Sequence, residues 1–217
     1  MKFSDKTLAV LKNFASINEG VVLKPGTVQK TMDANKQILV EAILEDDFPS
    51  EFGIYDLNQF LGNVTTLRNP ELTFNKDSVT LDDGELSLTY LSCSPNLIIT
   101  PPNKELEIKQ VDCRFSLTTA VLSKLIKVAT MNQLPNLSVW GKDGALFLKI
   151  HEKANDTSNS GLVNIGEYFG DEFIASFKTE HLKLLPADYD VELQKGAFAK
   201  FVSKDGNLKY FVSQEAK

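Results

Sequence analysis

The stretch IYDLNQFLGNVTTLRNPELTFNKDSVTLDDGELSLTYL, residues 54–91, contains the pattern that determines the predicted fold. After an apolar start it predicts an amphipathic helix over residues 56–68, with apolar side chains at helical spacing: Leu57, Phe60, Leu61, Val64 and Leu67. Three short strand-like segments follow, and Asp82-Asp83-Gly84 is typical of a hairpin turn. Residues 174–212 repeat this order of strand, helix and three strands. The repetition predicts an α+β protein built from similar units, while chance alternation, which any α+β protein shows, stays open as the alternative.

The rest of the chain follows the same rhythm of one helix and then several antiparallel strands. The remaining helices are predicted at three places: residues 4–17, 116–131 and 178–186. Hairpin turns are expected at Lys142-Asp143-Gly144 and at Lys204-Asp205-Gly206. The polar stretch 153–161 is expected to be a surface loop.

A proline-containing segment separates the two halves of the chain. Pro95, Pro101 and Pro102 suppress regular structure there, although the segment keeps some apolar residues. We therefore predict an N-terminal domain over residues 1–94, an extended linker over residues 95–107 and a C-terminal domain over residues 108–217.

The composition is that of an ordinary globular protein. Among 217 residues, 42% are hydrophobic and 24% are charged, and no apolar run is long enough to cross a membrane. The stretch Met1-Lys2-Phe3-Ser4-Asp5-Lys6 has charges where a signal peptide needs apolar residues, so we expect no secretion signal. Cys93 and Cys113 do not have the spacing of metal ligands, which favours free thiols in a reducing compartment.

The sequence contains no recognisable catalytic pattern. The two histidines, His151 and His181, do not form a ligand spacing, and neither a phosphate-binding loop nor a nucleophile elbow is present. The acidic clusters Glu45-Asp46-Asp47 and Asp82-Asp83 are interpreted as charged turns, with a metal site at Glu45–Asp47 as the alternative. We therefore predict no catalytic residues, no cofactor and no bound metal, and hence a protein that is not an enzyme.

The charges are unevenly distributed along the chain. The net charge is −6, but the four predicted helices contain only three of the 29 acidic residues, and each of the three lies in a first turn, where the helix dipole favours it: Asp5, Asp56 and Glu180. Six basic residues of these helices are the candidates for contact with an anion: Lys6, Lys12, Arg68, Lys124, Lys127 and Lys183.

Three of these bases lie on helix faces opposite the apolar side. Lys12, Lys124 and Lys127 are accompanied there by Asn, Ser and Thr, without acids or aromatic residues. Such a face suits the phosphate backbone of duplex DNA, contacted weakly and without sequence preference, rather than stacked single strands. The alternative is an ordinary solvated helix face, which lysine commonly occupies.

Three motifs in this order resemble the sliding clamps of T4-type bacteriophages, which are DNA polymerase processivity factors: Leu11-Lys12-Asn13-Phe14-Ala15-Ser16-Ile17-Asn18, Ile54-Tyr55-Asp56-Leu57-Asn58-Gln59-Phe60-Leu61-Gly62 and Pro101-Pro102-Asn103-Lys104. The resemblance spans nearly the whole chain and is thinner after Trp140. It implies a DNA-clamp fold of two similar domains, each with two helices packed on antiparallel sheets. Three subunits would form a ring, with twelve helices lining the hole and sheets continuing across the subunit boundaries.

The resemblance also implies partners. Such a clamp encircles duplex DNA and tethers the replicative DNA polymerase, and an ATP-dependent clamp loader opens the ring. These functions place it in the cytoplasm of the infected bacterial host, without a membrane partner. The competing functions are a non-enzymatic phage structural or adaptor module, and an enzyme that uses the Glu45–Asp47 cluster.

Two kinds of contact residue follow from the resemblance. The C-terminal peptide of the polymerase is expected to bind near the linker, and the candidates for this pocket are Ile98, Ile99, Pro101 and Val212. The alternative is that these residues only pack the linker against a domain. Tyr90 occupies a position where the family has an aromatic residue near the subunit interface. Here it is Tyr rather than Trp, and Leu91 replaces a proline.

Overall fold

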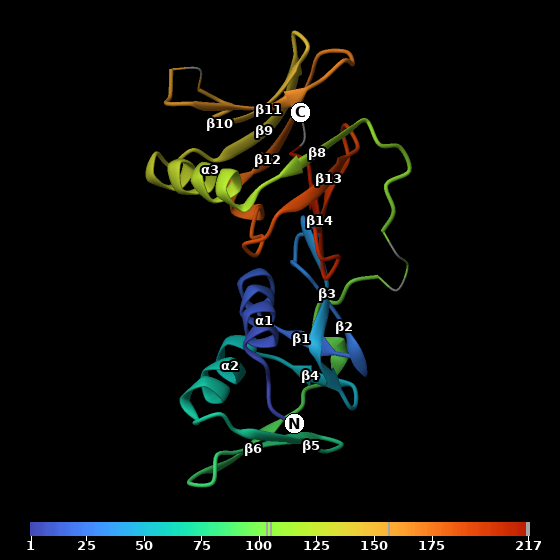
Figure 1. Cartoon of the computed structure of the whole chain (residues 1–217). Coiled ribbons are helices and arrows are strands. Elements are labelled where there is room, and N and C mark those ends of the chain that lie inside the picture. Colours follow the sequence, from blue (N-terminus) through green and yellow to red (C-terminus); the bar gives the residue numbers. More distant parts are fainter. Residues whose placement is uncertain (103, 105, 156, 216–217) are drawn as a thin grey trace. The chain divides into compact units, whose positions relative to one another are not determined.

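The computed structural model describes residues 1–102, 104, 106–155 and 157–215. The chain forms two separately packed units, Met1–Glu105 and Leu106–Lys217, both drawn in Figure 1. The predicted linker over residues 95–107 begins with the short 3-10 helix η1 (Pro95–Leu97). Positions 103 and 105 of that linker lie outside the described residues, and position 103 also belongs to the third motif of the resemblance. Position 156 of the predicted loop and positions 216–217 of the predicted C-terminal domain lie outside them as well.

Unit 1 combines two helices with three small antiparallel groups of strands. Its elements are, in chain order, α1 (Asp5–Ile17), β1 (Val21–Leu23), β2 (Gly26–Met32), β3 (Ile38–Phe48), β4 (Phe52–Ile54), α2 (Leu57–Thr66), β5 (Glu71–Phe74), β6 (Ser78–Asp82), β7 (Ser87–Leu91) and η1. Strand β1 pairs with β4, β2 pairs with β3, and β5, β6 and β7 form a three-stranded sheet. The two helices pack against each other, as Figure 1 shows.

Helix α1 is capped by the side chain of Ser4 at its start and is followed by Asn18, whose backbone N–H donates to the carbonyl of Phe14. The hydroxyl of Ser4 accepts a hydrogen bond from the backbone N–H of Thr7 at 3.1 Å, which caps the first turn. At the other end, the side chain of Asn18 donates to the carbonyl of Ile99 at 2.9 Å. The helix buries Leu11 and Phe14 completely, so its opposite face is free for solvent or a partner.

Phenylalanine rings fill the core of unit 1. Phe74 of β5 meets Phe48 and Phe52 edge to face, with ring centroids 6.0 and 5.4 Å apart. Phe60 of α2 packs against Tyr90 of β7, with ring centroids 5.1 Å apart. These edge-to-face contacts stabilise the fold beyond the effect of the apolar area that the rings bury. They also fix α2 on the sheet that ends at β7.

Unit 2 is formed by two antiparallel groups of strands and one α-helix. Its elements are β8 (Cys113–Leu117), α3 (Thr119–Met131), β9 (Asn136–Lys142), β10 (Ala145–His151), β11 (Gly161–Glu167), β12 (Phe173–Lys178), the 3-10 helix η2 (Thr179–His181), β13 (Tyr189–Leu193), β14 (Phe198–Ser203) and β15 (Leu208–Ser213). One sheet has the order β11-β10-β9-β12, and the second group has the order β15-β14-β13-β8.

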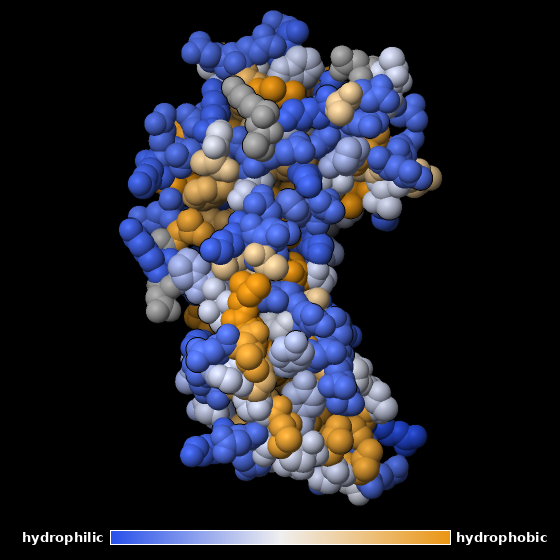
Figure 2. All heavy atoms as spheres, turned by 180° about the vertical axis from the view of Figure 1, so that it is seen from behind, coloured by the Kyte–Doolittle hydropathy of each residue, from blue (hydrophilic) through white to orange (hydrophobic). Residues whose placement is uncertain are grey.

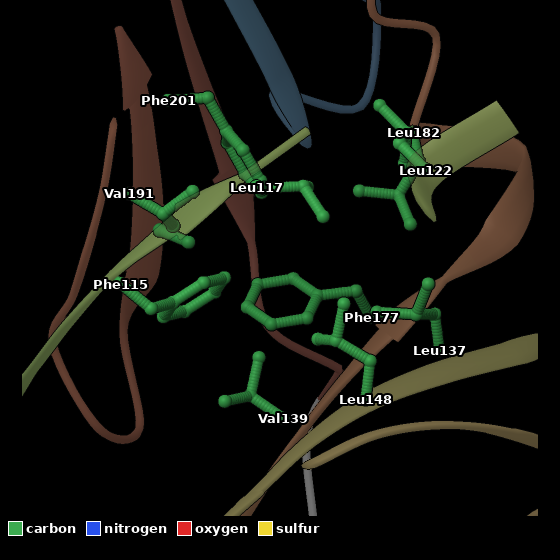
Figure 3. Close-up of a pocket in the computed structure, with 11 residues that line it drawn as sticks. Phe115, Leu117, Leu122, Leu137, Val139, Leu148, Phe177, Leu182, Val191 and Phe201 are labelled. Carbon is green, nitrogen blue, oxygen red and sulfur yellow. The ribbon is translucent and has the colours of Figure 1, made fainter. Parts of the chain in front are cut away.

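The core of unit 2 lies between these two sheets and α3 (Figure 3). Phe115 and Phe201 come from the second group of strands, Phe177 and Leu148 from the first sheet, and Leu122 from α3. They surround a cavity of about 10 Å³ whose lining side chains are all apolar. A space of this size without polar groups stays dry, so this cavity is a packing defect rather than a ligand site.

Three Asp-Gly turns were predicted, and all three are confirmed. Each glycine has a positive φ, which is 89° at Gly84, 78° at Gly144 and 77° at Gly206. Glycine adopts this conformation without the steric cost that a side chain would bring. The turns join β6 to β7, β9 to β10, and β14 to β15, which sets the register of three hairpins.

The prediction of two helices in each domain is wrong for the C-terminal half. Residues 178–186 do not form an α-helix, and only the three residues Thr179–His181 form a 3-10 turn. The N–H of Thr179 bonds to the carbonyl of Pro135, and its hydroxyl bonds to the carbonyl of Leu134, so neighbouring backbone groups hold this segment. A segment this short, with Pro186 at its end, does not offset the cost of helix nucleation.

The predicted bounds need three further corrections. Helix α3 begins at Thr119, capped by the Thr118 hydroxyl, because Ser116 and Leu117 belong to β8. The Glu45–Asp47 cluster is not a turn, since β3 continues through it to Phe48. Strand β11 follows the predicted loop at a place where no strand was expected.

Candidate functional site

Two helices present basic side chains opposite their buried sides. On α1, Lys6 and Lys12 are exposed while Leu11 and Phe14 are buried. On α3, Lys124 and Lys127 are exposed while Leu125 is buried. Helix α2 differs because it has no charged residue, and its exposed face consists of Asn58, Gln59, Gly62, Thr65 and Thr66. The basic faces predicted from the sequence therefore exist on α1 and α3.

The bases of α1 are partly neutralised. Lys6 Nζ lies 2.5 Å from Glu45 Oε1, and the hydrogen bond from Lys6, followed by one from Ser4, lowers the pKa of the Glu45 carboxyl. Asp46 accepts a hydrogen bond from the backbone N–H of Ser4 at 2.7 Å. These two acids of β3 therefore stabilise the start of α1. Among the described residues, no group of three metal-binding side chains is close enough to hold an ion.

The three other lysines of α1 and α3 lie apart from the acidic side chains of the described residues. None of the ion pairs found among the described residues includes Lys12, Lys124 or Lys127. Helix α3 itself contains no acid. Its two lysines therefore contribute positive charge that the surrounding protein does not cancel, which suits contact with an anion.

The remaining two predicted DNA-facing residues lie outside the helices. Arg68 follows α2 in a bend, and its backbone N–H donates to Asp83 Oδ2 at 3.1 Å. Its charge is one of the causes, after the backbone hydrogen bonds from Leu86, Arg68 and Glu85, that lower the pKa of Asp83. Lys183 is exposed just after η2. Neither residue extends a helix face as predicted.

Strands β7 and β11 differ from every other described strand. Each lies at an edge of its sheet, and each lacks a buried residue, whereas all other strands of the described chain bury at least one. Leu91 of β7 is 73% exposed and Leu162 of β11 is 52% exposed. Figure 2 shows that exposed apolar side chains occur among hydrophilic ones on the visible face of the molecule. Exposed edges with apolar side chains are suited to pairing with another chain.

Tyr90, predicted at a subunit interface, lies on β7. Its ring packs on Phe60, and its hydroxyl donates to the carbonyl of Asp56, the residue that caps α2, at 3.3 Å. Burial raises the pKa of Tyr90. The side chain is only partly buried, so it joins the edge strand to α2 and still leaves surface for a further contact.

Unit 2 has a surface groove of about 940 Å³, which is the size of a typical ligand site. Its lining combines the exposed side of β9 and β12, the turn between β13 and β14, and the segment after β15: Trp140, Lys153, Glu172, Phe173, Ile174, Ser176, Lys195, Gly196, Gln214 and Glu215. Ile174 is 51% exposed, so an apolar anchor in the groove is accessible.

The segment after β15 shapes this groove. The side chain of Gln214 accepts from the N–H of Gly196 at 2.9 Å and donates to the carbonyl of Gln194 at 2.6 Å, which fixes the turn between β13 and β14. The N–H of Glu215 donates to the carbonyl of Ser176 on β12 at 2.8 Å. These contacts give the groove a preformed wall.

The predicted peptide-pocket residues do not share one environment. Ile98 is buried and approaches Gly20 in unit 1, where a Cβ would lie 3.3 Å from Ile98 Cγ1. Ile99 is exposed and Pro101 is partly buried. Val212 is completely buried in β15, opposite Ala199. For Ile98 this environment supports the alternative in which it anchors the segment after η1, and none of the four lines the groove of unit 2.

A serine and a histidine meet in unit 2 without forming a nucleophilic site. Ser138 Oγ lies 2.8 Å from His151 Nε2 and 2.8 Å from Ser176 Oγ. Ser138 is 0% exposed and His151 is 9% exposed, so a substrate cannot reach this hydroxyl. Cys93 and Cys113 are free thiols, and burial raises the pKa of both. Among the described residues, no helix is long and apolar enough to cross a membrane.

The fold is that of solved PCNA structures. A structure of A. fulgidus PCNA with the C-terminal region of FEN-1 bound matches with a TM-score of 0.70 at 13% identity, covering 97% of this chain and 95% of that one. A PCNA2–PCNA3 complex from Sulfolobus tokodaii matches with a TM-score of 0.65 at 12% identity, covering 100% and 98% of the two chains. The structure therefore defines a clamp-fold protein.

The sequence comparisons give the family. The model of the DNA polymerase processivity factor family matches residues 2–99. The sliding clamp of Vibrio phage KVP40 is 33% identical over 100% of both chains, and that of Enterobacteria phage T4 is 27% identical over 100% of this chain and 97% of its own. The chain belongs to the sliding clamp family of T4-type bacteriophages.

Proposed function

We propose that three copies of this chain form a closed ring that encircles duplex DNA and tethers the replicative DNA polymerase. The observation that carries this proposal is the pair of sheet edges, β7 in unit 1 and β11 in unit 2, which are the described strands without a buried residue. Because the two edges differ, each copy offers one edge to one neighbour and the other edge to the next. Such head-to-tail contacts close into a ring when the rotation between copies fits.

The side chains favour an antiparallel register between β7 of one copy and β11 of the next. On the core side, half-buried Leu88 and Tyr90 would meet half-buried Ile165 and Val163 of the neighbour. On the outer side, Leu91 would lie opposite Leu162, which covers the two exposed leucines. A parallel register would instead place Leu91 opposite Gly166, so less of the apolar surface of Leu91 would be buried.

The basic helix faces supply the contact with DNA in this proposal. Lys12, Lys124 and Lys127 have no ion-pair partner among the described residues, and α2 adds an uncharged polar face of Asn, Gln and Thr. Lysine contacts with phosphate depend on salt and not on base sequence. A few such contacts per copy hold the duplex weakly enough for sliding, whereas the closed ring, rather than affinity, prevents dissociation.

The groove of unit 2 is the proposed binding site for the C-terminal peptide of the polymerase. Its support is an exposed apolar anchor position at Ile174, a preformed wall at Gln214 and a volume suited to a short segment. An extended peptide that inserts apolar side chains is a common mode of recognition. In this proposal the chain performs no reaction, an ATP-dependent loader opens the ring, and the site of action is the cytoplasm of the infected bacterial host.

The assembly is tested with substitutions at the edges. Leu91→Asp places a charge in the proposed apolar contact, and we expect it to convert rings of three copies into smaller species in analytical ultracentrifugation. Ile43→Asp is the matched control, since Ile43 is 43% exposed on β3, a strand that already pairs with β2. A wild-type chain that stays monomeric at all concentrations, or an unchanged mass after Leu91→Asp, would contradict the ring.

Encirclement is tested by comparing two forms of DNA. A ring loaded by the clamp loader should stay on nicked circular DNA and run off the ends of linear DNA, and it should lengthen the products of the polymerase. Equal retention on both forms, without longer products, would favour the competing function of a phage adaptor module that binds DNA without enclosing it.

A further inference from the structure

All cation–π contacts among the described residues lie in unit 2, and two of the three rings involved, Trp140 and Phe173, line its groove. Lys142 and Lys149 place their ammonium groups 5.0 and 5.6 Å from the ring of Trp140. Lys195 lies 4.3 Å from the ring of Phe173 and 5.7 Å from that of Tyr168. Trp140, Phe173 and Lys195 line the groove itself. Aromatic rings therefore position Lys195 within the groove and Lys142 and Lys149 beside it, at Trp140.

Among the described residues, aromatic rings rather than acidic side chains contact these three lysines. None of them takes part in an ion pair found among the described residues, although the whole chain has a net charge of −6. A ring face orients an ammonium group without cancelling its charge. The positive charge at this groove is therefore both positioned and uncompensated.

The two acids of the groove have donors of their own. Glu172 accepts a hydrogen bond from the indole N–H of Trp140 at 3.3 Å. Glu215 accepts from the side chain of Asn136 at 2.8 Å and lies 4.0 Å from Lys153 Nζ. The groove therefore has satisfied acids beside lysines that still lack a counter-charge.

We infer that this groove selects peptides in which carboxylates flank the apolar anchor, with Lys142, Lys149 and Lys195 as the residues that recognise them. The inference rests on the proposed peptide site and adds the chemistry of its ligand. The exposed Ile174 contacts the apolar side chain, and the three lysines bind the carboxylates. Charge complementarity of this kind discriminates between partners and speeds their association.

A peptide fits these observations better than the phosphate backbone of DNA. The lining includes the apolar Phe173 and Ile174, which can contact an apolar side chain of a peptide but form no favourable interaction with a phosphate. Competition by duplex DNA for the groove is therefore the outcome that would assign these lysines to nucleic acid instead.

The test uses two labelled synthetic peptides that share phenylalanine and leucine anchors, with flanking aspartates in one and asparagines in the other. Binding is measured on the intact protein by fluorescence anisotropy. Trp140 is the only tryptophan of the chain, so its emission shows whether a peptide enters the groove. We expect the aspartate peptide to bind roughly 3- to 10-fold more tightly at low salt, a difference that shrinks as salt rises.

Substitutions then assign the effect to the lysines. The double variant Lys142→Gln with Lys149→Gln should remove most of the difference between the two peptides, and Lys142→Arg with Lys149→Arg should restore it. Lys76→Gln is the control, because Lys76 is exposed in unit 1, between β5 and β6. Equal affinities for the two peptides, or a difference that survives the Gln variant, would overturn the inference.

The experiment separates this inference from the peptide site itself. Ile174→Asp should abolish binding of both peptides. If both peptides bind equally and Ile174→Asp abolishes the binding of both, the groove is the peptide site but the inferred selection for charge is wrong. If neither peptide binds the wild-type ring, the groove is not the peptide site and both proposals fall.

The carboxylates have two possible sources, a side chain or the terminus of the partner peptide. Amidation of the peptide C-terminus removes the second source and leaves the aspartates in place. A loss of affinity on amidation that Lys195→Met also causes assigns Lys195 to the terminal carboxylate. No loss on amidation assigns all three lysines to side-chain acids, and failure of all carboxylate changes to alter affinity rejects the inference.

Discussion

The two units share a similar order of elements but differ in their helical segment and in their last strand. Residues 54–91 of unit 1 and residues 174–212 of unit 2 both contain a strand, a helical segment and three antiparallel strands. In unit 1 the helical segment is the three-turn α2 and the last strand, β7, is an edge without buried residues. In unit 2 the helical segment shrinks to a 3-10 turn, and the last strand, β15, buries three residues in a row. The repeat therefore preserves the core and varies in its helical segment and its last strand.

The largest expected effect comes from breaking the core of one unit and sparing the other. Phe177→Ala enlarges the apolar cavity of unit 2, and we expect a loss of about 3–5 kcal/mol in its free energy of unfolding. Urea denaturation followed by Trp140 emission reports unit 2, while circular dichroism reports both units. Phe60→Ala in the core of unit 1 is the matched variant and should leave the Trp140 transition nearly unchanged. Equal shifts of that transition in both variants would show that the units unfold as one.

The second effect concerns the edge strands β7 and β11, and substitutions in either strand should weaken the ring to a similar extent. Leu162→Asp should weaken the ring about as much as Leu91→Asp, by about 1–3 kcal/mol per contact, because each charge would be buried against an apolar neighbour. The two substitutions together should cost less than the sum of their separate effects, since both break the same contact. The dissociation of the ring on dilution measures these values. Strict additivity would place the two leucines in separate contacts.

A smaller effect should distinguish the two basic helices. Lys124→Gln with Lys127→Gln removes two unpaired charges, whereas Lys6→Gln with Lys12→Gln removes one unpaired charge and one that Glu45 already holds. The salt dependence of DNA binding should therefore fall more in the α3 variant, by about 2 in the logarithmic slope for each copy in contact with phosphate. The measurement is binding to duplex DNA over a range of salt concentrations. Equal slopes would mean that Lys6 leaves Glu45 to contact DNA.

The smallest expected effect is the change in stability at acid pH that one carboxyl group in each unit causes. Lys6 lowers the pKa of Glu45, and Lys204, followed by Ser116, lowers the pKa of Asp190. A carboxyl with a folded pKa below its ordinary value stabilises the fold above that value, and the contribution is lost as the pH falls through the folded pKa. Glu45→Gln and Asp190→Asn should therefore lower the melting temperature slightly at pH 7, and this difference should disappear as the pH falls through the folded pKa of each carboxyl. A difference that persists in acid would assign the effect to shape instead of charge.

The sequence was sufficient for the strong periodic elements. Helices α1 and α2 have clear apolar stripes and capping residues, Ser4 and Asp56, and the three Asp-Gly turns require glycine at a positive φ. These features are local, so one sequence reveals them. The clamp fold and family followed from the order of motifs, which the comparisons bear out.

What the sequence did not reveal depends on long-range contacts. Strand β11 was missed because its polar and glycine residues, such as Asn164 and Gly166, weaken the alternation that indicates a strand, and its pairing with β10 includes a bulge. The acids of β3 were mistaken for a turn because their partners, Ser4 and Lys6, lie about 40 residues away. The groove brings together β9, β12 and the segment after β15, and no local pattern predicts that meeting.

In the proposed ring, the difference between the edge strands β7 and β11 has a genetic consequence. A copy that carries Leu162→Asp has a damaged β11 and an intact β7, so it can still join a wild-type neighbour through β7. One such copy is enough to leave the ring open. In a cell infected by wild-type and mutant phage together, the defective subunit would therefore impair rings made mostly of normal subunits. An edge mutation should behave as dominant, whereas a mutation that only unfolds the chain, such as Phe177→Ala, should behave as recessive.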